Sequence, residues 1–226
     1  MKDKKIRFLA TGDFHSDSKL IAKIKAIKEF DSIDFIVLIG DLSEKKNDFK
    51  ELLDAFKGKD IFMVPGNHET KKKLKILEDF YGVHLIGNQP VIIHDDVALF
   101  GSNYVPLGPY GVNENDILEN LIKNYEAIKD IKVKIHLSHL PPADTRIGDA
   151  SPYYPFIGGS DAVREFLEEF SPDITLVGHI HEASGLEEII NNTKVVNVGR
   201  TFKIFEFDPE SSKITIVGGE KLKTKK

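Results

Sequence analysis

The chain has 226 residues, of which 41% are hydrophobic and 30% are charged, a composition typical of a globular protein rather than a disordered one. It contains no cysteine, which excludes disulfides, iron–sulfur clusters, zinc fingers and cysteine nucleophiles, so any metal site must use His, Asp, Glu, Asn or backbone oxygen ligands. Lysine and arginine total 31 against 36 aspartates and glutamates, and the resulting net charge of −5 argues against a broad nucleic-acid-binding surface without excluding local binding.

A chain of this length is expected to fold as a single domain over residues 1–226, with a sizeable core. No apolar run approaches the ~18 residues that a membrane span needs, and the N-terminus lacks an apolar segment followed by a small-residue cleavage site. We therefore expect neither a membrane span nor a secretory signal, which makes a cytoplasmic location the default. The oligomeric state is left open.

The first part of the chain alternates short apolar runs, typical of buried strands, with segments whose apolar residues recur at helical spacing. The pattern predicts strands over residues 5–11, 34–39 and 61–64, and helices over residues 20–30, 48–56 and 71–80. Continuous apolar strands separated by helices favour a parallel sheet covered on both faces. The carboxyl ends of its strands would lie along one edge, where open α/β sheets bind ligands.

The second part of the chain is less regular. The pattern predicts a hairpin over residues 91–93 and 97–100, helices over 113–128 and 161–170, and strands over 133–138 and 174–177. Residues 140–160 are rich in Pro and Gly and are predicted to form a long loop, which inside a domain is usually functional or mobile. From residue 185 onward we expect short strands over residues 186–190, 194–197, 201–207 and 214–217, sharing one core with the α/β half.

Polar residues cluster where the predicted strands end. The sequences at these ends are Gly12-Asp13-Phe14-His15, Gly40-Asp41, Gly66-Asn67-His68-Glu69, Ser138-His139 and Gly178-His179-Ile180-His181. One such residue alone would be an ordinary turn or capping residue, but five strand ends in phase make that explanation weak. We expect seven side chains to converge: Asp13, His15, Asp41, Asn67, His139, His179 and His181.

This set of side chains has the chemistry of a metal site. Imidazoles and carboxylates without thiolates suit zinc, iron, manganese or nickel. Seven ligands are too many for one tetrahedral catalytic ion, but they fit two ions that share one carboxylate. Two ions ~3.5–4 Å apart can clamp the attacking and leaving oxygens of an in-line displacement at phosphorus.

The ordered motifs D-x-H, G-D, G-N-H-E, a strand-end His and G-H-x-H resemble those of the calcineurin-like metallophosphoesterase superfamily. The resemblance extends from Asp13 to His181. It implies an α/β fold, a four-layer αββα sandwich of two mixed β-sheets flanked by helices, with a dimetal site at the carboxyl ends of the sheet strands. The motifs HLPP, GGS, GHIHEASG and VNVG further resemble those of small class III phosphodiesterase-like members.

The resemblance also implies a role for each motif residue. The first ion would be held by Asp13, His15 and His181, the second by Asn67, His139 and His179, and Asp41 would bridge them. His68 would be catalytic rather than a ligand, lying near the phosphate and assisting the leaving oxygen, a role that suits a side chain titrating near neutral pH. The ions would be divalent (Mn, Fe, Zn, Ni or Mg, with Mn favoured), and a hydroxide bridging them would attack phosphorus in line. Ser16 stands where many members have glycine, which should matter little for metal binding.

The expected activity is hydrolysis of a small phosphodiester, for which cyclic nucleotides are one candidate class by analogy. Protein phosphatases of the superfamily follow G-D with a motif that supplies an arginine. Residues 42–46 supply none, which argues against a protein phosphatase.

A phosphomonoesterase or a nuclease that uses the same site is an alternative, although such nucleases usually carry an added capping domain. A metal-binding scaffold without catalysis is the alternative from another class, opposed by the complete motif set. The G-N-H-E element argues against a redox or oxygen-activating metalloprotein.

Several further polar residues could have a functional or a structural role. Glu69 and Glu182 could orient a metal-bound histidine or be simple loop residues. His136 is predicted to point away from His139 and to be structural, as are His84 and His94. The loop residues Arg146, Tyr153, Tyr154 and Phe156 could cover the site and influence substrate choice, or form an ordinary surface. Asn103 and Tyr104 are weaker candidates of the same kind.

Overall fold

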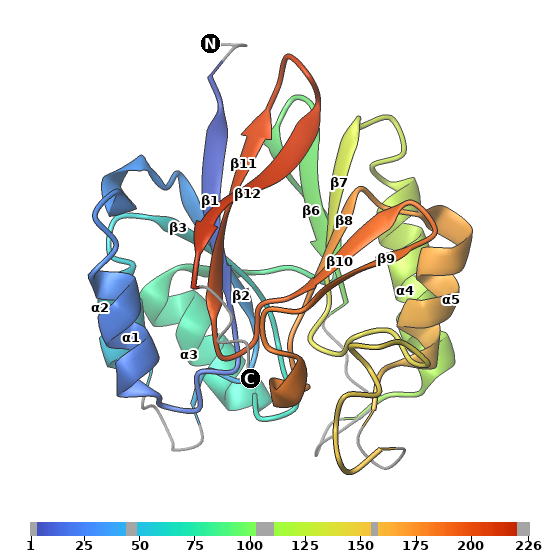
Figure 1. Cartoon of the computed structure of the whole chain (residues 1–226), viewed down its shortest axis with the longest axis horizontal. Helices are drawn as coiled ribbons and strands as arrows, with labels where there is room; N and C mark the ends of the chain where they lie inside the picture. Colours follow the sequence, from blue (N-terminus) through green and yellow to red (C-terminus); the bar gives the residue numbers. More distant parts are fainter. Residues whose placement is uncertain (1–3, 44–48, 103–110, 155–157, 221–226) are drawn as a thin grey trace, which may run out of the picture.

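Two mixed β-sheets of six strands each lie face to face in the computed structural model, which describes residues 4–43, 49–102, 111–154 and 158–220. Helices cover the outer face of each sheet, so the order of layers is helix, sheet, sheet, helix (Figure 1). This arrangement confirms the α/β sandwich that the motif resemblance implied. Among the described residues, no helix combines the length and apolarity needed to cross a membrane.

The first sheet has the strand order β12-β11-β1-β2-β3-β4. Its strands are β1 (Ile6–Thr11), β2 (Phe35–Ile39), β3 (Asp60–Val64), β4 (Val83–Leu85), β11 (Phe202–Asp208) and β12 (Lys213–Gly219). β1 to β4 are parallel, whereas β11 pairs antiparallel with β1, and β12 pairs antiparallel with β11. The helices packed on its outer face are α1 (Ser18–Lys25), α2 (Lys50–Ala55) and α3 (Lys71–Tyr81).

The second sheet has the strand order β5-β6-β7-β8-β10-β9. Its strands are β5 (Val91–His94), β6 (Val97–Gly101), β7 (Val133–Leu137), β8 (Ile174–Val177), β9 (Glu187–Ile190) and β10 (Thr193–Asn197). The four central strands are parallel, and the two edge strands β5 and β9 are antiparallel to their neighbours. The helices α4 (Glu114–Glu126) and α5 (Asp161–Phe170) cover its outer face. Two 3₁₀ turns, Phe30–Ser32 and His181–Ala183, complete the elements among the described residues.

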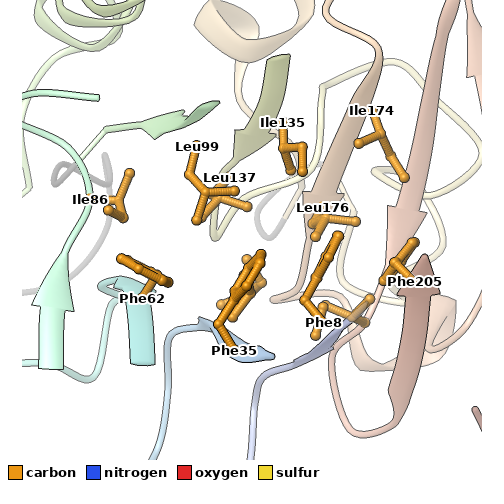
Figure 2. Packing of buried hydrophobic residues seen from close by; sticks show 14 of the residues in the cluster. Phe8, Phe35, Phe62, Ile86, Leu99, Ile135, Leu137, Ile174, Leu176 and Phe205 are labelled. Atoms are coloured by element: carbon orange, nitrogen blue, oxygen red, sulfur yellow. The ribbon is translucent and has the colours of Figure 1, made fainter. Parts of the chain in front are cut away.

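Aromatic and aliphatic side chains fill the space between the two sheets (Figure 2). Phe8 stacks between Phe35 and Phe205, with ring centroids 5.0 and 4.9 Å apart. Leu137 and Leu176 face them from the second sheet (Figure 2). Full burial of such a side chain contributes about 1.5–3 kcal/mol, so this layer fixes how the sheets meet.

The parallel sheet predicted for the first part of the chain carries only three of the five polar strand ends. β1, β2 and β3 lie in the first sheet, whereas β7 and β8 lie in the second. Most residues of these strands are buried, on both faces of the sheet, so their sequences are largely apolar, and that of β2 is apolar throughout. An apolar strand sequence indicates that both faces of the strand are covered. It does not indicate whether a helix or another sheet covers each face.

The ends of the two sheets are nevertheless joined by backbone contacts. Gly12, which follows β1, forms an isolated parallel bridge with Gly199, which follows β10. The N–H of Arg200 donates to the carbonyl of Gly12 at 3.0 Å. The carboxyl ends of the motif strands therefore meet across the seam between the sheets.

Two local expectations need correction. The first helix starts earlier than expected, because the Asp17 side chain accepts from the backbone N–H groups of Lys19 and Leu20 and caps it at the N-terminus, and the helix also ends earlier, at Lys25. The short edge strand β4 was not predicted. The long stretch after His139 is closed at its base, where the N–H of Ser160 donates to the carbonyl of Pro141, and Ile147 within it is fully buried.

Candidate metal centre

The polar loops after β1, β2, β3, β7 and β8 meet at one end of the sandwich and bring all seven sequence-predicted ligands together. Three groups of residues have ligand atoms that all lie within 4.8 Å of one another: Asp13, His15 and His181; His15, Asp41 and His68; and Asp13, Asp41 and His139. Asn67 and His179 complete the set, because Asn67 Oδ1 lies 3.0 Å from His139 Nε2 and the rings of His139 and His179 are 5.2 Å apart.

One oxygen of Asp41 lies at the centre of the cluster. Asp41 Oδ2 is 3.4 Å from His139 Nε2, 3.7 Å from His15 Nε2 and 3.9 Å from His68 Nε2. The other oxygen, Oδ1, accepts the backbone N–H of His68 at 2.9 Å. The carboxylate is thereby held by one oxygen and presents the other to the imidazoles on both sides.

Asp13 is arranged in the same way. Its Oδ2 accepts the backbone N–H of His179 at 2.8 Å, and its Oδ1 lies 3.7 Å from His181 Nε2. Both carboxylates therefore tie a histidine-bearing loop in place with one oxygen and leave the other to face the cluster.

The backbone at the site is strained. Asp13, His15, Asp41 and His179 all have positive φ angles, of 50°, 43°, 51° and 65°. Residues other than glycine rarely adopt this left-handed conformation, which costs on the order of 1–3 kcal/mol each and clusters at functional sites. Four of the seven predicted ligands are thus held in conformations that the surrounding contacts must impose.

Two glycines allow the loops to approach closely. Gly40 has φ +72°, and a Cβ there would lie 2.3 Å from the backbone nitrogen of Gly66. A Cβ at Gly199 would lie 2.0 Å from Asp13 Oδ2. A side chain at either position would push the loops of Asp41 and Asn67 apart, or displace the Asp13 carboxylate.

Glu69 holds two of these loops together. Its buried carboxylate accepts the backbone N–H groups of Asp41 at 2.7 Å, Leu42 at 3.1 Å and Gly66 at 2.8 Å. Burial and the charge of Asp41 raise the pKa of Glu69, against the effect of these hydrogen bonds. Of the two sequence readings, the structure favours a supporting role, exerted on the backbone that carries Asp41 rather than on a histidine.

Replacing Glu69 by glutamine is expected to weaken metal binding by about 10–100-fold, the usual cost of losing a partner that orients a ligand. The amide NH₂ of glutamine cannot accept a hydrogen bond, so at least one of the three N–H groups would lose its partner. Calorimetric titration with Mn²⁺ measures the effect. Glu182→Gln is the matched control, because Glu182 faces the same site but is exposed. Equal affinities in the two variants would contradict the supporting role of Glu69.

The electrostatics of the cluster favour cation binding. Burial opposes ionisation of Asp41, but the positive charge and hydrogen bond of His139 outweigh it and hold the Asp41 pKa below its ordinary value. In the same way, burial lowers the pKa of His139, but the Asp41 charge outweighs burial and raises that pKa to about 10. Without metal, His139 therefore keeps its proton, and the positive charge of its ring lies beside the Asp41 carboxylate, which would bind a cation.

Two other histidines are held in the neutral form that ligates metals. Burial and the neighbouring His139 lower the pKa of His179 to about 4. Burial also lowers the pKa of His15, although Asp41 and Asp13 partly oppose it.

The residues fit a pair of divalent ions. Asp13 Oδ1 and His179 Nε2 are buried without a hydrogen-bond partner among the described residues, and leaving such a group unsatisfied costs about 1–3 kcal/mol. A bound cation would satisfy both atoms. The donors are imidazole nitrogens and carboxylate and amide oxygens, a set typical of divalent metals. Metal binding itself stays a prediction.

His68 is more exposed than the two other histidines beside Asp41. Its side chain is 47% exposed, compared with 8% for His15 and 0% for His139, while the predicted ligand His181, beside Asp13, is 41% exposed. Its ring packs edge-on against His15 with centroids 5.1 Å apart, and it lines a cleft of about 270 Å³ above the cluster. His68 can therefore contact a bound substrate from the open side.

The structure places some of the remaining candidate residues in the cleft and others outside it. Tyr153 and Glu182 line the cleft. Arg146 instead donates to the carbonyl of Glu187, and the Tyr154 hydroxyl to Asp144. Phe156, Asn103 and Tyr104 lie outside the described residues.

The other three histidines lie away from the cluster. His136 is fully buried between Phe100 and Phe166, and burial lowers its pKa to about 3. His84 stacks on Phe62, with ring centroids 5.3 Å apart, and His94 packs near Phe207. These positions agree with the structural reading of all three residues.

Asn197 and two residues of the cleft, Ser151 and Ile180, were not predicted as site residues from the sequence. The Asn197 amide donates to the carbonyls of Gly178 and Ile180, and its oxygen accepts the N–H of Gly199. It thus holds the loop that carries His179 and His181. A signal was available, because Asn197 is the polar last residue of β10 and the predicted ligands lie just past the ends of five other strands, but β10 was not counted among the polar strand ends.

Comparisons with known proteins agree with this fold. A family model described as calcineurin-like phosphoesterase matches residues 6–183. The protein MJ1162 of Methanocaldococcus jannaschii is 28% identical over 204 residues, which cover 86% of this chain and 88% of that protein. Two solved structures share the fold. The protein TT1561 of Thermus thermophilus has a TM-score of 0.69 at 16% identity, covering 94% of this chain and 98% of that one. The phosphopantetheinyl hydrolase PptH of Mycobacterium tuberculosis has a TM-score of 0.64 at 14% identity, covering 86% and 89%.

Proposed function

The chain belongs to the calcineurin-like phosphoesterase family, and from this premise we propose that it is a dimetal phosphoesterase that hydrolyses small phosphodiesters. The observation that carries the proposal is the position of Asp41 Oδ2, which lies within 4 Å of imidazole nitrogens of His15, His68 and His139. A carboxylate oxygen placed in this way can be shared by two ions.

Asp13, His15 and His181 would hold one ion, and Asn67, His139 and His179 the other, with Asp41 between them. When bound, two such ions stabilise the charge that develops on phosphoryl oxygens and lower the pKa of water. The protein fixes their ligands beforehand through the backbone hydrogen bonds of Asp13, Asp41 and Glu69.

His68 supplies the remaining function. It lies on the cleft side of the cluster with a partly exposed ring. Its imidazolium can hydrogen-bond the phosphoester and give a proton to the leaving oxygen as the bond to phosphorus breaks. Positioned proton transfer of this kind contributes about 10²–10⁴-fold to the rate.

The charge of the cleft supports a diester rather than a monoester. No lysine or arginine is among the described residues that line the cleft, and Glu182 adds a carboxylate there. A phosphodiester carries one negative charge, whereas a monoester carries nearly two at neutral pH. A cleft whose described lining adds a carboxylate and no lysine or arginine to the metal cluster suits the less charged substrate better.

The test is hydrolysis by metal-stripped protein with and without added Mn²⁺, using bis(p-nitrophenyl) phosphate and p-nitrophenyl phosphate. The expected result is cleavage that requires metal and prefers the diester. Preference for the monoester would instead indicate a phosphomonoesterase. Metal uptake without cleavage of either compound would favour a metal-binding scaffold, and failure to take up metal would contradict the dimetal site.

A further inference from the structure

The residues that line the cleft above the cluster are of two chemical kinds. One group, the predicted ligands and His68, accounts for the phosphoryl group. The other group contains no predicted ligand and comprises Ser151, Tyr153, Ile180 and Glu182. Within it, Tyr153 and Glu182 are exposed and can contact the groups attached to phosphorus.

Tyr153 contributes the one non-histidine aromatic ring among the described residues lining the cleft, and this tyrosine is 65% exposed. An exposed ring at the rim of a polar cleft leaves a flat apolar surface in contact with water. Its burial by a ligand would be favourable.

Hydrogen bonds to Ser151 fix the turn that carries Tyr153. Ser151 is buried, and its hydroxyl accepts the backbone N–H of Tyr153 at 3.2 Å, while its carbonyl accepts the N–H of Tyr154 at 3.1 Å. These hydrogen bonds close a turn with Tyr153 at its outer edge.

The preceding segment gives this turn a rigid base. Ile147 is fully buried against the helices α4 and α5, and the Thr145 hydroxyl bridges the carbonyl of Pro142 and the N–H of Gly148. Tyr153 is thus presented by a packed segment, which reduces the entropy lost when it contacts a ligand.

We propose that Tyr153 determines specificity by stacking on a planar aromatic substituent of the phosphoester held at the metal cluster. This inference rests on the proposed function and adds to it a substrate class, phosphodiesters with an aryl or nucleobase-like group. Glu182, which lines the same cleft, accepts hydrogen bonds from N–H or O–H groups of that substituent and disfavours anionic ones.

Tyr154 provides a natural comparison. It is the next residue and is also exposed, but its hydroxyl is bonded to Asp144 at 3.2 Å and it is not among the residues lining the cleft. Replacing Tyr154 by alanine removes a similar exposed ring from the same turn without changing the cleft wall.

The experiment measures binding to the Mn²⁺-loaded protein by calorimetry. The probes are the monomethyl esters of phenylphosphonate and methylphosphonate, which both carry one negative charge and differ only in the group on phosphorus. The unmodified protein is expected to prefer the phenyl compound by about tenfold, the size expected for one stacked ring. Tyr153→Ala should remove most of this preference and leave the affinity for the methyl compound unchanged, whereas Tyr153→Phe and Tyr154→Ala should retain the preference.

The outcomes separate the two proposals. If the methyl compound binds but Tyr153→Ala keeps the phenyl preference, or weakens both compounds equally, the role of Tyr153 is wrong while the phosphoesterase stands. If neither compound binds to the metal-loaded protein, and bis(p-nitrophenyl) phosphate is not cleaved, both proposals are overturned.

Discussion

Asp41→Asn is expected to give a folded protein that has lost tight metal binding and almost all activity. Asparagine keeps the shape of the side chain and can still accept the backbone N–H of His68, so the loop should hold. It removes the negative charge from the oxygen that lies between His15 and His139. Losing a partner that only orients a ligand costs about 10–100-fold in metal affinity, and loss of a ligand shared by both ions should exceed that range.

The measurement is metal content after dialysis, together with hydrolysis of bis(p-nitrophenyl) phosphate at saturating Mn²⁺. Asp173→Asn is the matched control, because Asp173 also accepts a backbone N–H, that of Lys134 at 2.8 Å, but lies immediately before β8, at the end of that strand away from the cluster. Two metals per chain in Asp41→Asn, with activity retained, would show that Asp41 is not the shared ligand.

The fold was predictable from the sequence where burial leaves a simple pattern. β8 and α5 were predicted with the bounds that the structure shows, because the strand is a short, largely apolar run and Ser160 caps the helix. The division into two sheets was not predictable from periodicity, since strands covered by a sheet and strands covered by helices are equally apolar. Only the motif resemblance carried that information.

The convergence of the site residues followed from one physical regularity, the polar residue just past each strand. The detailed geometry did not follow, because it depends on contacts between segments far apart in sequence. Nothing local to Glu69 indicates that it accepts the N–H groups of Asp41 and Leu42. Likewise, only the fold places Tyr153 in the cleft and Tyr154 outside it.

His68→Ala is expected to lower turnover of a phosphodiester by about 10²–10⁴-fold, the usual contribution of a positioned acid or base, while two metals per chain remain bound. The reason is its place in the site: His68 is the partly exposed histidine beside the central carboxylate, and its backbone N–H, which alanine retains, supports Asp41. Steady-state kinetics and metal analysis of the same preparation measure both quantities.

The identity of the leaving group distinguishes the two ways in which His68 can act. If it protonates the leaving oxygen, His68→Ala should lose more activity with a phenyl ester than with a p-nitrophenyl ester, because p-nitrophenolate departs readily without a proton. If it only stabilises charge on the phosphoryl group, the loss should be the same for both. His84→Ala is the control, since His84 is an exposed histidine on β4 that stacks on Phe62, away from the cluster. Loss of metal on His68→Ala would contradict both modes, because it would make His68 a ligand.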